Sequence, residues 1–489
     1  MDIRWLLIIT FLTSLSAARD LQALVIDAAE SRNAIHIFNA IYCSMRQWGS
    51  SINHNGMSLF IATIPAGTEL FHGTVSPGPV VGMDWLAFEP EHAAIFARMG
   101  FRMPIPGASM YREQPPEQVF LGSEVRTGDD GGTTKFGWFH TYVARRDLRL
   151  LYIDGMSAGK CDLGTLDSQD YLILNRTLSD PDKTVDGKRG LDLCNLVKKE
   201  WHGRIDGFVR MELGFELLFC DFQSGLGLIH ATKVARRNDS FNISFPIPGS
   251  DAGDLFNLVK AATSRYNGIG GNRVTLDYEA FFTAYTYSLD LFKAGRFPRL
   301  ENTSSDILSS MRRDVYDLVM AENRPAQTYN WQCVADMIVS RYATHLKILV
   351  SGRFTTLELL AEQIERILLP FMDYDDRNTA REIDRCTTYA FPAEYSECTA
   401  SRAIQRVSRA ICSTLTSAAK AGDHAAAVQM IRDLIEYLDW PTWKECRGCG
   451  DDEVCLTPMW PMGTAEDYEH PRCLNATQLD NRGGYWGSI

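Results

Sequence analysis

Three separate segments of the chain carry side chains whose types could take part in catalysis. One segment has the pattern of a strand that ends in His72 followed by Gly73. A second segment, 85–98, has the pattern of a strand and a short helix that contains Phe96, and a third has that of a strand with Glu216 near its start. A fixed carboxylate can stabilise a developing positive charge or polarise a hydroxyl, and an aromatic ring can hold a planar group.

In this order the three segments, which span 67–222, resemble the ADP-ribosyltransferase fold, in particular its branch with a histidine, an aromatic residue and a glutamate in the site. The poly-ADP-ribose polymerases share this plan, and the tRNA 2′-phosphotransferases share its strand followed by His-Gly. The resemblance implies that His72 hydrogen-bonds the adenosine ribose of NAD and that the backbone of Gly73 holds the nicotinamide amide. It also implies that Phe96 stacks on nicotinamide, where the family usually has a tyrosine, and that Glu216 contacts the nicotinamide ribose.

The reaction that the resemblance implies is cleavage of NAD, with transfer of ADP-ribose to water or to an unknown protein or small-molecule acceptor. The protein would then be an NAD-dependent ADP-ribosyltransferase or an NAD glycohydrolase. Two departures affect the site, because Phe96 has no hydroxyl and Glu212 competes with Glu216 for the acidic role. On one regular strand, four residues would separate the two glutamates by about 13 Å, so that only one could reach the reacting ribose. Glu216 fits the family strand better. The whole chain also resembles uncharacterised secreted proteins of filamentous fungi.

A different reaction class is indicated by Gly-x-Ser-x-Gly around Ser157, which follows an apolar run. In α/β-hydrolases this spacing exposes a nucleophilic serine on a sharp turn. Ser157 would act with Asp206 and His230, in the usual downstream order, as a serine esterase. The residues after Gly159 do not have the pattern of a helix, which makes this alternative the weaker one.

A third hypothesis is a secreted interaction protein that keeps the fold without catalysis. Phe96 and the large helical part of the chain, which has no recognised catalytic motif, favour this interpretation. Asp167 and Asp170 could share a cation if they lay on a helix, but the other ligands of a calcium or magnesium site are missing. The sequence therefore predicts no metal.

The first residues indicate export. Arg4 precedes a short apolar run and then small residues up to Ala18, which is the pattern of a signal peptide over 1–18. Twelve cysteines and five glycosylation sequons fit a secreted or lumenal glycoprotein. The sequons begin at Asn175, Asn238, Asn242, Asn302 and Asn475. No later stretch is long and apolar enough for a transmembrane anchor.

The cysteine-rich C-terminal tail could be mistaken for a zinc knuckle. Its Cys446-x-x-Cys449 is followed by Cys455 and Cys473, with His470 nearby. In an exported chain these cysteines are better interpreted as disulfides, whose pairing the sequence leaves open.

Composition indicates an ordinary globular protein. The 489 residues are 45% hydrophobic and 22% charged, which excludes a mostly disordered, collagen-like or polytopic membrane protein. With 49 basic and 61 acidic residues the net charge is −12, so the chain would repel a phosphate backbone at long range. General nucleic-acid binding is therefore not expected.

The predicted fold class is α+β, in three parts that follow the signal peptide. An ADP-ribosyltransferase-like mixed α/β domain with an N-terminal helix covers 19–245, a mainly helical domain covers 246–440, and a cysteine-containing, loop-rich tail covers 441–489. The boundary is placed at 245–253, where proline and glycine interrupt regular structure. A loop insertion is expected at 101–135, which is rich in Pro, Gly and charge.

Short apolar runs and longer apolar stripes predict the individual elements. Strands are expected at 58–63, 69–72, 85–88, 148–153, 206–211 and 215–220. Helices are expected around 21–46, 255–262, 307–319, 334–349, 357–368 and 423–438, the last of them capped by Asp423 and stopped before Pro441.

Overall fold

The computed structural model describes most of the chain. The described residues are 28–53, 56–98, 137–161, 163, 166–176, 186–234, 252–265, 269–322, 329–479 and 482–486. The predicted signal peptide, the predicted insertion at 101–135 and all but the last two residues of the predicted boundary at 245–253 lie outside these ranges. The sequons at Asn238 and Asn242 also lie outside them.

The fold is mixed α/β, with 47% of the described residues helical and 18% in strands. Its described residues form two compact units. A sheet unit contains residues 43–282, 294–322 and 444–486, and a helical unit contains residues 28–42, 283–293 and 329–443.

This division differs from the linear one expected from the sequence. The N-terminal helix α2 (Ala34–Cys43) packs mostly within the helical unit, where Phe38 stacks on Trp440 at a centroid distance of 6.0 Å and Asn39 donates to the Leu438 carbonyl over 3.1 Å. The residues after 252 and the cysteine-containing tail instead belong largely to the sheet unit. An apolar helical stripe shows that a helix is buried but not which part of the chain buries it, which is why the linear boundaries differ.

One large sheet forms the centre of the sheet unit. In the described residues its strand order is β8-β4-β2-β3-β7-β6-β5-β1-β9. The strands are β1 (Ser58–Ile64), β2 (Glu69–Thr74), β3 (Asp84–Ala87), β4 (Gly137–Ala144), β5 (Leu148–Ile153), β6 (Gly207–Met211), β7 (Phe215–Phe219), β8 (Leu226–Val234) and β9 (Thr275–Thr283). The six strands expected from apolar runs are confirmed to within two residues, whereas β4, β8 and β9 were not predicted.

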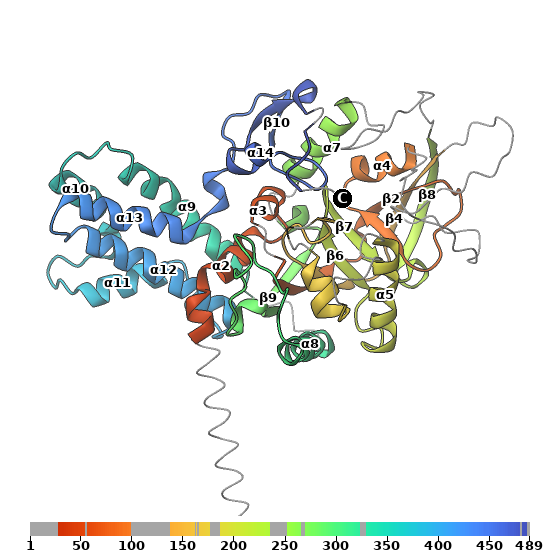
Figure 1. Cartoon of the computed structure of the whole chain (residues 1–489), viewed down its shortest axis with the longest axis horizontal. Helices are drawn as coiled ribbons and strands as arrows, with labels where there is room; N and C mark the ends of the chain where they lie inside the picture. The colour runs from red at the N-terminus through yellow and green to blue at the C-terminus, as the bar shows by residue number, and fades with distance from the viewer. Residues whose placement is uncertain are drawn as a thin grey trace, which may run out of the picture. The chain divides into compact units, whose positions relative to one another are not determined.

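Two helices cover the face of the sheet that carries the candidate site (Figure 1). Helix α4 (Pro90–Arg98) lies against β2 at Gly73, where an added Cβ would come within 2.1 Å of the Ala93 carbonyl oxygen. Helix α5 (Asp186–Lys199) lies against Trp85, since a Cβ added at Gly190 would come within 2.4 Å of the Trp85 ring. Glycine is needed at both positions because the helices approach this closely.

The remaining helices of the sheet unit are short or peripheral. They are α3 (Gln47–Ile52), α6 (Phe222–Gly225), α7 (Ala252–Arg265), α8 (Ser305–Met320) and α14 (Ala465–Glu469). The helices expected at 255–262 and 307–319 are confirmed as α7 and α8.

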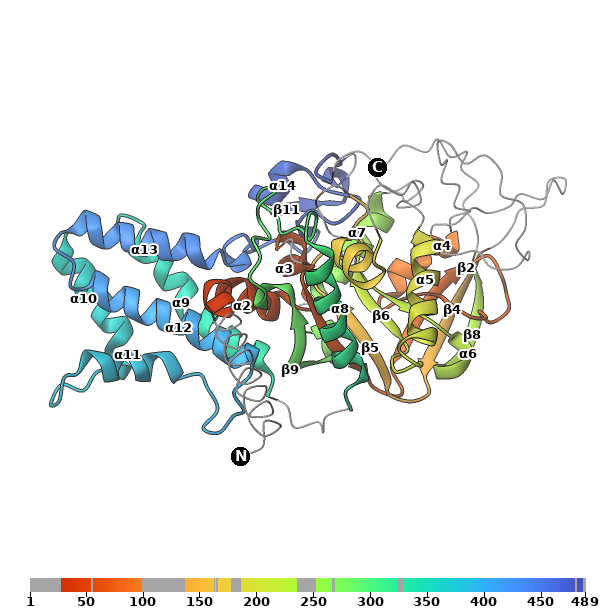
Figure 2. The same ribbon diagram turned by 60° about the horizontal axis from the view of Figure 1, so that its bottom comes forward.

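The helical unit contains α2 together with α9 (Trp331–Leu349), α10 (Leu357–Leu368), α11 (Thr379–Thr388), α12 (Thr399–Ala418) and α13 (His424–Leu438). Figure 2 shows α12 and α13 side by side, and the two helices are in contact. The predicted cap of α13 is confirmed, because the Asp423 carboxylate accepts from the Ala426 amide over 2.9 Å.

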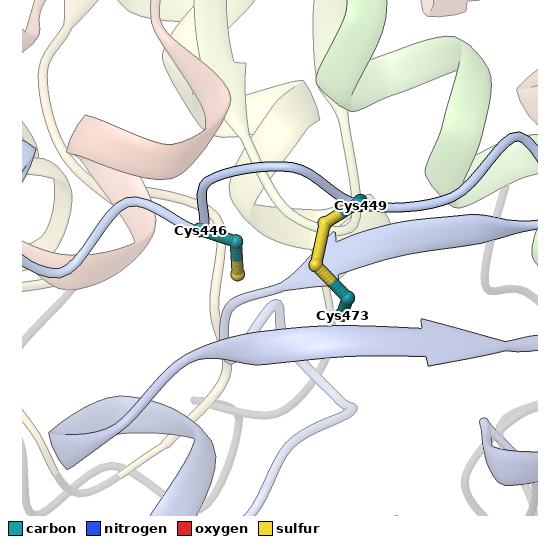
Figure 3. A group of neighbouring side chains, drawn as sticks. All are labelled: Cys446, Cys449 and Cys473. Carbon is teal, nitrogen blue, oxygen red and sulfur yellow. A yellow bond between two sulfur atoms is a disulfide. The ribbon is translucent and has the colours of Figure 1, made fainter.

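Four disulfides join eight of the described cysteines, which confirms the expectation of disulfide bonds. They are Cys194–Cys220, Cys386–Cys412, Cys446–Cys455 and Cys449–Cys473. The last two hold the tail around the small sheet of β10 (Glu453–Leu456) and β11 (Arg472–Asn475), and Figure 3 shows the Cys449–Cys473 bond beside Cys446. Among the described residues, no helix combines the length and the apolarity that a membrane span requires.

Candidate active-site pocket

A small hollow opens on the sheet beneath α4. It contains all four residues that the sequence singled out, since His72, Gly73, Phe96 and Glu216 line it. The other lining residues are Phe71, Leu86, Ala87, His92 and Ala93. The pocket therefore joins β2, β3 and α4, which follow one another closely, to β7, which lies far away along the chain.

The pocket forms where β2 and β3 separate. The β2–β4 ladder extends over the whole of β2, but β2 and β3 share only the pair Phe71–Ala87. Next to this pair, Nδ1 of His72 lies 2.7 Å from the Trp85 carbonyl oxygen. A carbonyl can only accept, so Nδ1 carries the proton and donates it. The imidazole thus replaces a ladder hydrogen bond at the point where the strands diverge.

The ring of His72 lies on the opposite face of the sheet from Glu216. Phe71, Ala87 and Glu216 are cross-strand partners and share one face, so the side chain between Phe71 and Gly73 points to the other face. There Nε2 of His72 is 3.8 Å from Asp84 Oδ2 and has no hydrogen-bond partner among the described residues. Burial lowers the pKa of His72 to about 4, so the ring is neutral at pH 7. His72 therefore meets the pocket chiefly through its backbone.

Helix α4 supplies one wall of the pocket. Phe96 and His92 are one helical turn apart, with ring centroids separated by 5.8 Å. Gly73 contributes only backbone atoms, since it has no side chain. His92 was not predicted as a site residue, although its i, i+4 spacing from Phe96 is the signal that places both on one face of a helix.

The start of α4 is fixed by a buried carboxylate. Glu89 is 1% exposed and accepts from Nη2 of Arg273 over 2.5 Å, and it also pairs with Arg265. Nη1 of Arg273 donates to the Phe88 carbonyl oxygen over 2.6 Å. These contacts anchor the link between β3 and α4, and so they set the position of Phe96 over the sheet.

Glu216 is held by an ion pair from the neighbouring strand. Nε of Arg210, on β6, donates to Glu216 Oε1 over 2.9 Å. The same guanidinium donates to Asp186 Oδ2 over 2.6 Å and to Gln169 Oε1 over 2.9 Å, and it lies 4.8 Å from the Trp85 ring. Arg210 is fully buried, so each of its donors needs these partners.

The charges around Glu216 are balanced within the protein. Burial raises the pKa of Glu216 to about 7, although Arg210 favours the ionised form. Burial also disfavours charge on Asp186, but Arg210, Lys160 and Arg189 together hold its pKa below the usual range. Asp186 is thus the permanent anion of the cluster, whereas Glu216 titrates close to neutral pH.

Glu212 does not line the pocket but lies close to Glu216. It follows β6 in the turn to β7 and pairs with Lys160, whose Nζ is 3.4 Å from Asp186 Oδ2 and 4.5 Å from the Trp460 ring centroid. One carboxylate oxygen from each of Asp186, Glu212 and Glu216 lies within 4.8 Å of the others. The expected spacing of about 13 Å is wrong because a turn, rather than one regular strand, separates the two glutamates.

Three carboxylates at this spacing could ligate a hard cation. Arg210 and Lys160 already supply positive charge to the same oxygens, so the cluster is an ion-pair network as it stands. The contacts of Asp167 and Asp170 are likewise to arginines, since Asp167 pairs with Arg299 and Asp170 with Arg189.

The residues of the esterase hypothesis are not brought together. Ser157 is fully buried, and its hydroxyl donates to the Ile153 carbonyl oxygen over 2.8 Å. Asp206 pairs with Arg146, and Nε2 of His230 lies 3.3 Å from the Thr141 hydroxyl. Within the described part of the chain, these three side chains form no nucleophile–base–acid arrangement.

Comparisons with known proteins identify one domain family and two yeast proteins that are similar to this chain. The YPL277C N-terminal domain family matches residues 23–129 and 106–252. The uncharacterized protein YOR389W of Saccharomyces cerevisiae is 24% identical over 539 residues, which cover 90% of this chain and 84% of the relative. The uncharacterized protein YPL277C of the same yeast is 30% identical over 234 residues, or 44% of this chain and 46% of the relative. No solved structure gives a significant match. Every residue that lines the pocket falls within the stretch that is similar to the YPL277C N-terminal domain.

Proposed function

We propose that this chain is an exported, ADP-ribosyltransferase-like protein that binds NAD in the pocket and cleaves it. The observation that carries the proposal is that His72, Gly73, Phe96 and Glu216 line one hollow although they come from three distant segments. The hollow is small and partly open to solvent. Only the nicotinamide ring would enter it, and the rest of the dinucleotide would lie outside.

The reaction breaks the bond between the nicotinamide ring nitrogen and C1′ of the ribose. The bonding electron pair stays on the ring nitrogen, so the pyridinium becomes neutral nicotinamide and the ribose becomes an oxocarbenium-like cation. Oε1 of Glu216 is held by Arg210, which leaves Oε2 to stabilise that cation. Water then adds to C1′ and releases a proton, so that NAD and water give nicotinamide, ADP-ribose and a proton. An acceptor hydroxyl in place of water makes the reaction a transfer.

The other lining residues fit the leaving group. Phe71 and Phe96 offer aromatic faces, and the backbone of Gly73 offers polar atoms for an amide. His72 contributes by holding β2 to Trp85 where the strands separate. The expected hydrogen bond of His72 to the adenosine ribose does not fit this arrangement, because Nε2 is buried on the opposite face of the sheet from Glu216.

Export is part of the proposal. The four disulfides fit an oxidising compartment, and the glycosylation sequons at Asn175 and Asn302 lie on exposed residues. Together with the predicted signal peptide, these features favour secretion or residence in the lumen of the secretory pathway.

A second candidate is a binding protein that does not catalyse. The observation in its favour is that Glu216 is only 5% exposed and already forms an ion pair with Arg210. Under this candidate, the pocket holds a planar ligand and the bond to ribose stays intact.

The test uses the disulfide-bonded full chain and NAD labelled separately in its nicotinamide and adenylate halves. We expect free nicotinamide to accumulate, with the adenylate label appearing as ADP-ribose or on an added acceptor. Saturable NAD binding without release of nicotinamide would favour the non-catalytic candidate. The absence of both binding and release would reject the proposed function.

A further inference from the structure

His92 is a polar side chain in the pocket that no part of the proposed reaction has used. It lies on the first turn of α4 and is 5% exposed. It lines the hollow together with Glu216 and Phe96, and its ring contacts that of Phe96 at a centroid distance of 5.8 Å. It therefore faces the same space as the groups assigned to the nicotinamide end of NAD.

The ring nitrogens of His92 make no hydrogen bond to any residue in the described ranges. Its backbone amide donates to the Glu89 carbonyl oxygen over 3.1 Å, but this leaves the imidazole unused. Buried polar side chains are nearly always hydrogen-bonded. Because the imidazole lines the pocket, a polar group on whatever occupies that pocket is in a position to serve as its partner.

The protonation state of His92 limits what this group can be. Burial and, as a smaller contribution, the positive charge of Lys160 lower the pKa of His92 to about 4. At neutral pH the ring is uncharged and offers one N–H donor and one nitrogen acceptor. A neutral ligand group that both donates and accepts is its natural complement.

A primary carboxamide is such a group. It has two N–H donors and an oxygen with two lone pairs. The backbone of Gly73 supplies at most one donor and one acceptor, which leaves one N–H and one lone pair without a partner. A carboxylate on the same ring would present no N–H to the His92 acceptor and would add negative charge near Glu216.

We propose that His92 contacts the substrate and recognises the carboxamide of the nicotinamide ring, so that the site selects NAD over its nicotinic acid analogue. This proposal rests on the proposed function, since it assigns a role to the leaving group of that reaction. The hydrogen bond is made by a side chain on α4, one turn away from the stacking Phe96.

The kinetic test compares three variants of the full chain on NAD and on the nicotinic acid analogue of NAD. His92→Phe keeps a planar ring without its hydrogen bonds and should lower kcat/KM for NAD by about tenfold, with a much smaller change for the analogue. His92→Gln restores a donor and an acceptor and should recover part of the loss. His230→Phe changes an exposed histidine and serves as the matched control.

If His92→Phe keeps the melting temperature of the wild type and the same selectivity for NAD over the analogue, His92 does not have the proposed role. The proposal that the chain cleaves NAD would be unaffected. No nicotinamide release by the wild type would instead reject the proposed function.

A second measurement does not depend on folding of the variants. A crystal structure of the wild-type chain soaked with nicotinamide should place a ring nitrogen of His92 within about 3.2 Å of the amide. An amide elsewhere, or no bound nicotinamide, would overturn the inference.

Discussion

Glu216 and Arg210 are cross-strand partners on β7 and β6, and Nε of the arginine donates to the carboxylate over 2.9 Å. The same guanidinium also binds Asp186, at the first turn of α5. A buried cation thus fixes the carboxylate that we assign to catalysis and joins it to a helix on the same face of the sheet.

Removal of the Arg210 charge should destabilise the sheet unit strongly. In Arg210→Met, Asp186 and Glu216 lose their shared cation while remaining buried, which costs about 3–5 kcal/mol for pairs of this kind. Arg146→Met is the control, because the Arg146 side chain is 48% exposed and its ion pair with Asp206 should contribute about 1 kcal/mol. Urea unfolding of both variants measures the difference. Equal stabilities would show that the buried network does not support the fold.

Gly73 should not tolerate even a methyl group. In Gly73→Ala the new Cβ would meet the Ala93 carbonyl oxygen at 2.1 Å and the Ala97 amide nitrogen at 2.5 Å, so α4 must move. We expect a loss of about 1–3 kcal/mol together with loss of ligand binding in the pocket. Gly78→Ala, where the nearest atom is 3.9 Å away, should resemble the wild type. A Gly73→Ala protein with unchanged melting temperature and binding would contradict the observed approach of α4.

Two disulfides allow an effect on the pocket to be distinguished from an effect on the stability of the whole chain. Cys194–Cys220 joins α5 to the residue after β7, and Cys386–Cys412 joins α11 to α12, each with a sequence separation of 26. Chain entropy therefore predicts a similar loss of about 3.5 kcal/mol when either pair is changed to serine. Only loss of Cys194–Cys220 should also weaken ligand binding, because that bond ties Asp186 and its helix to the strand of Glu216. Calorimetry and ligand titration of both variants test this, and equal effects on binding would argue against it.

Acidification should lower the folding stability of the wild type through its buried histidines. Burial lowers the pKa of His140 to about 4 from 6.5, so the unfolded chain takes up a proton that the folded chain excludes. The stability contributed by neutral His140 is present above pH 6.5 and is lost as the pH falls towards 4. Glu216 titrates with the opposite sign, so the useful quantity is the difference between wild type and variant. The melting temperature of His140→Phe should fall less over this range than that of the wild type, while His230→Phe should follow the wild type. Parallel curves for all three proteins would refute this contribution.

The sequence predicted the strands of the pocket because their side chains form continuous apolar runs. Strand β7 is buried along its length, and the run around Glu216 reads directly as a strand. β8 was not predicted because its residues from Leu228 to Val234 are exposed or only partly buried, and they do not form an apolar run. β4 was not predicted for a different reason, since His140 and Thr141 interrupt its apolar residues.

The partners of Glu216 could not be predicted from local patterns. Arg210 lies in the middle of a strand, where a charge usually indicates a solvent-facing position, and its partner Asp186 is 24 residues away. His92 was within a segment that the sequence singled out, but only the position of α4 against β2 shows that it enters the pocket. Burial and pairing of charges are properties of the assembled sheet, and a single sequence does not contain them.

The most direct test compares nicotinamide release from NAD by Glu216→Gln and Glu212→Gln. Glutamine keeps the shape of Glu216 and its hydrogen bond to Arg210, but it removes the negative charge that stabilises the ribose cation. Our account predicts that Glu216→Gln loses at least about a hundredfold in kcat with a melting temperature close to the wild type. Glu212→Gln, whose carboxylate pairs with Lys160 and does not line the pocket, should retain most of the activity. Equal nicotinamide release by Glu216→Gln and the wild type would contradict the account.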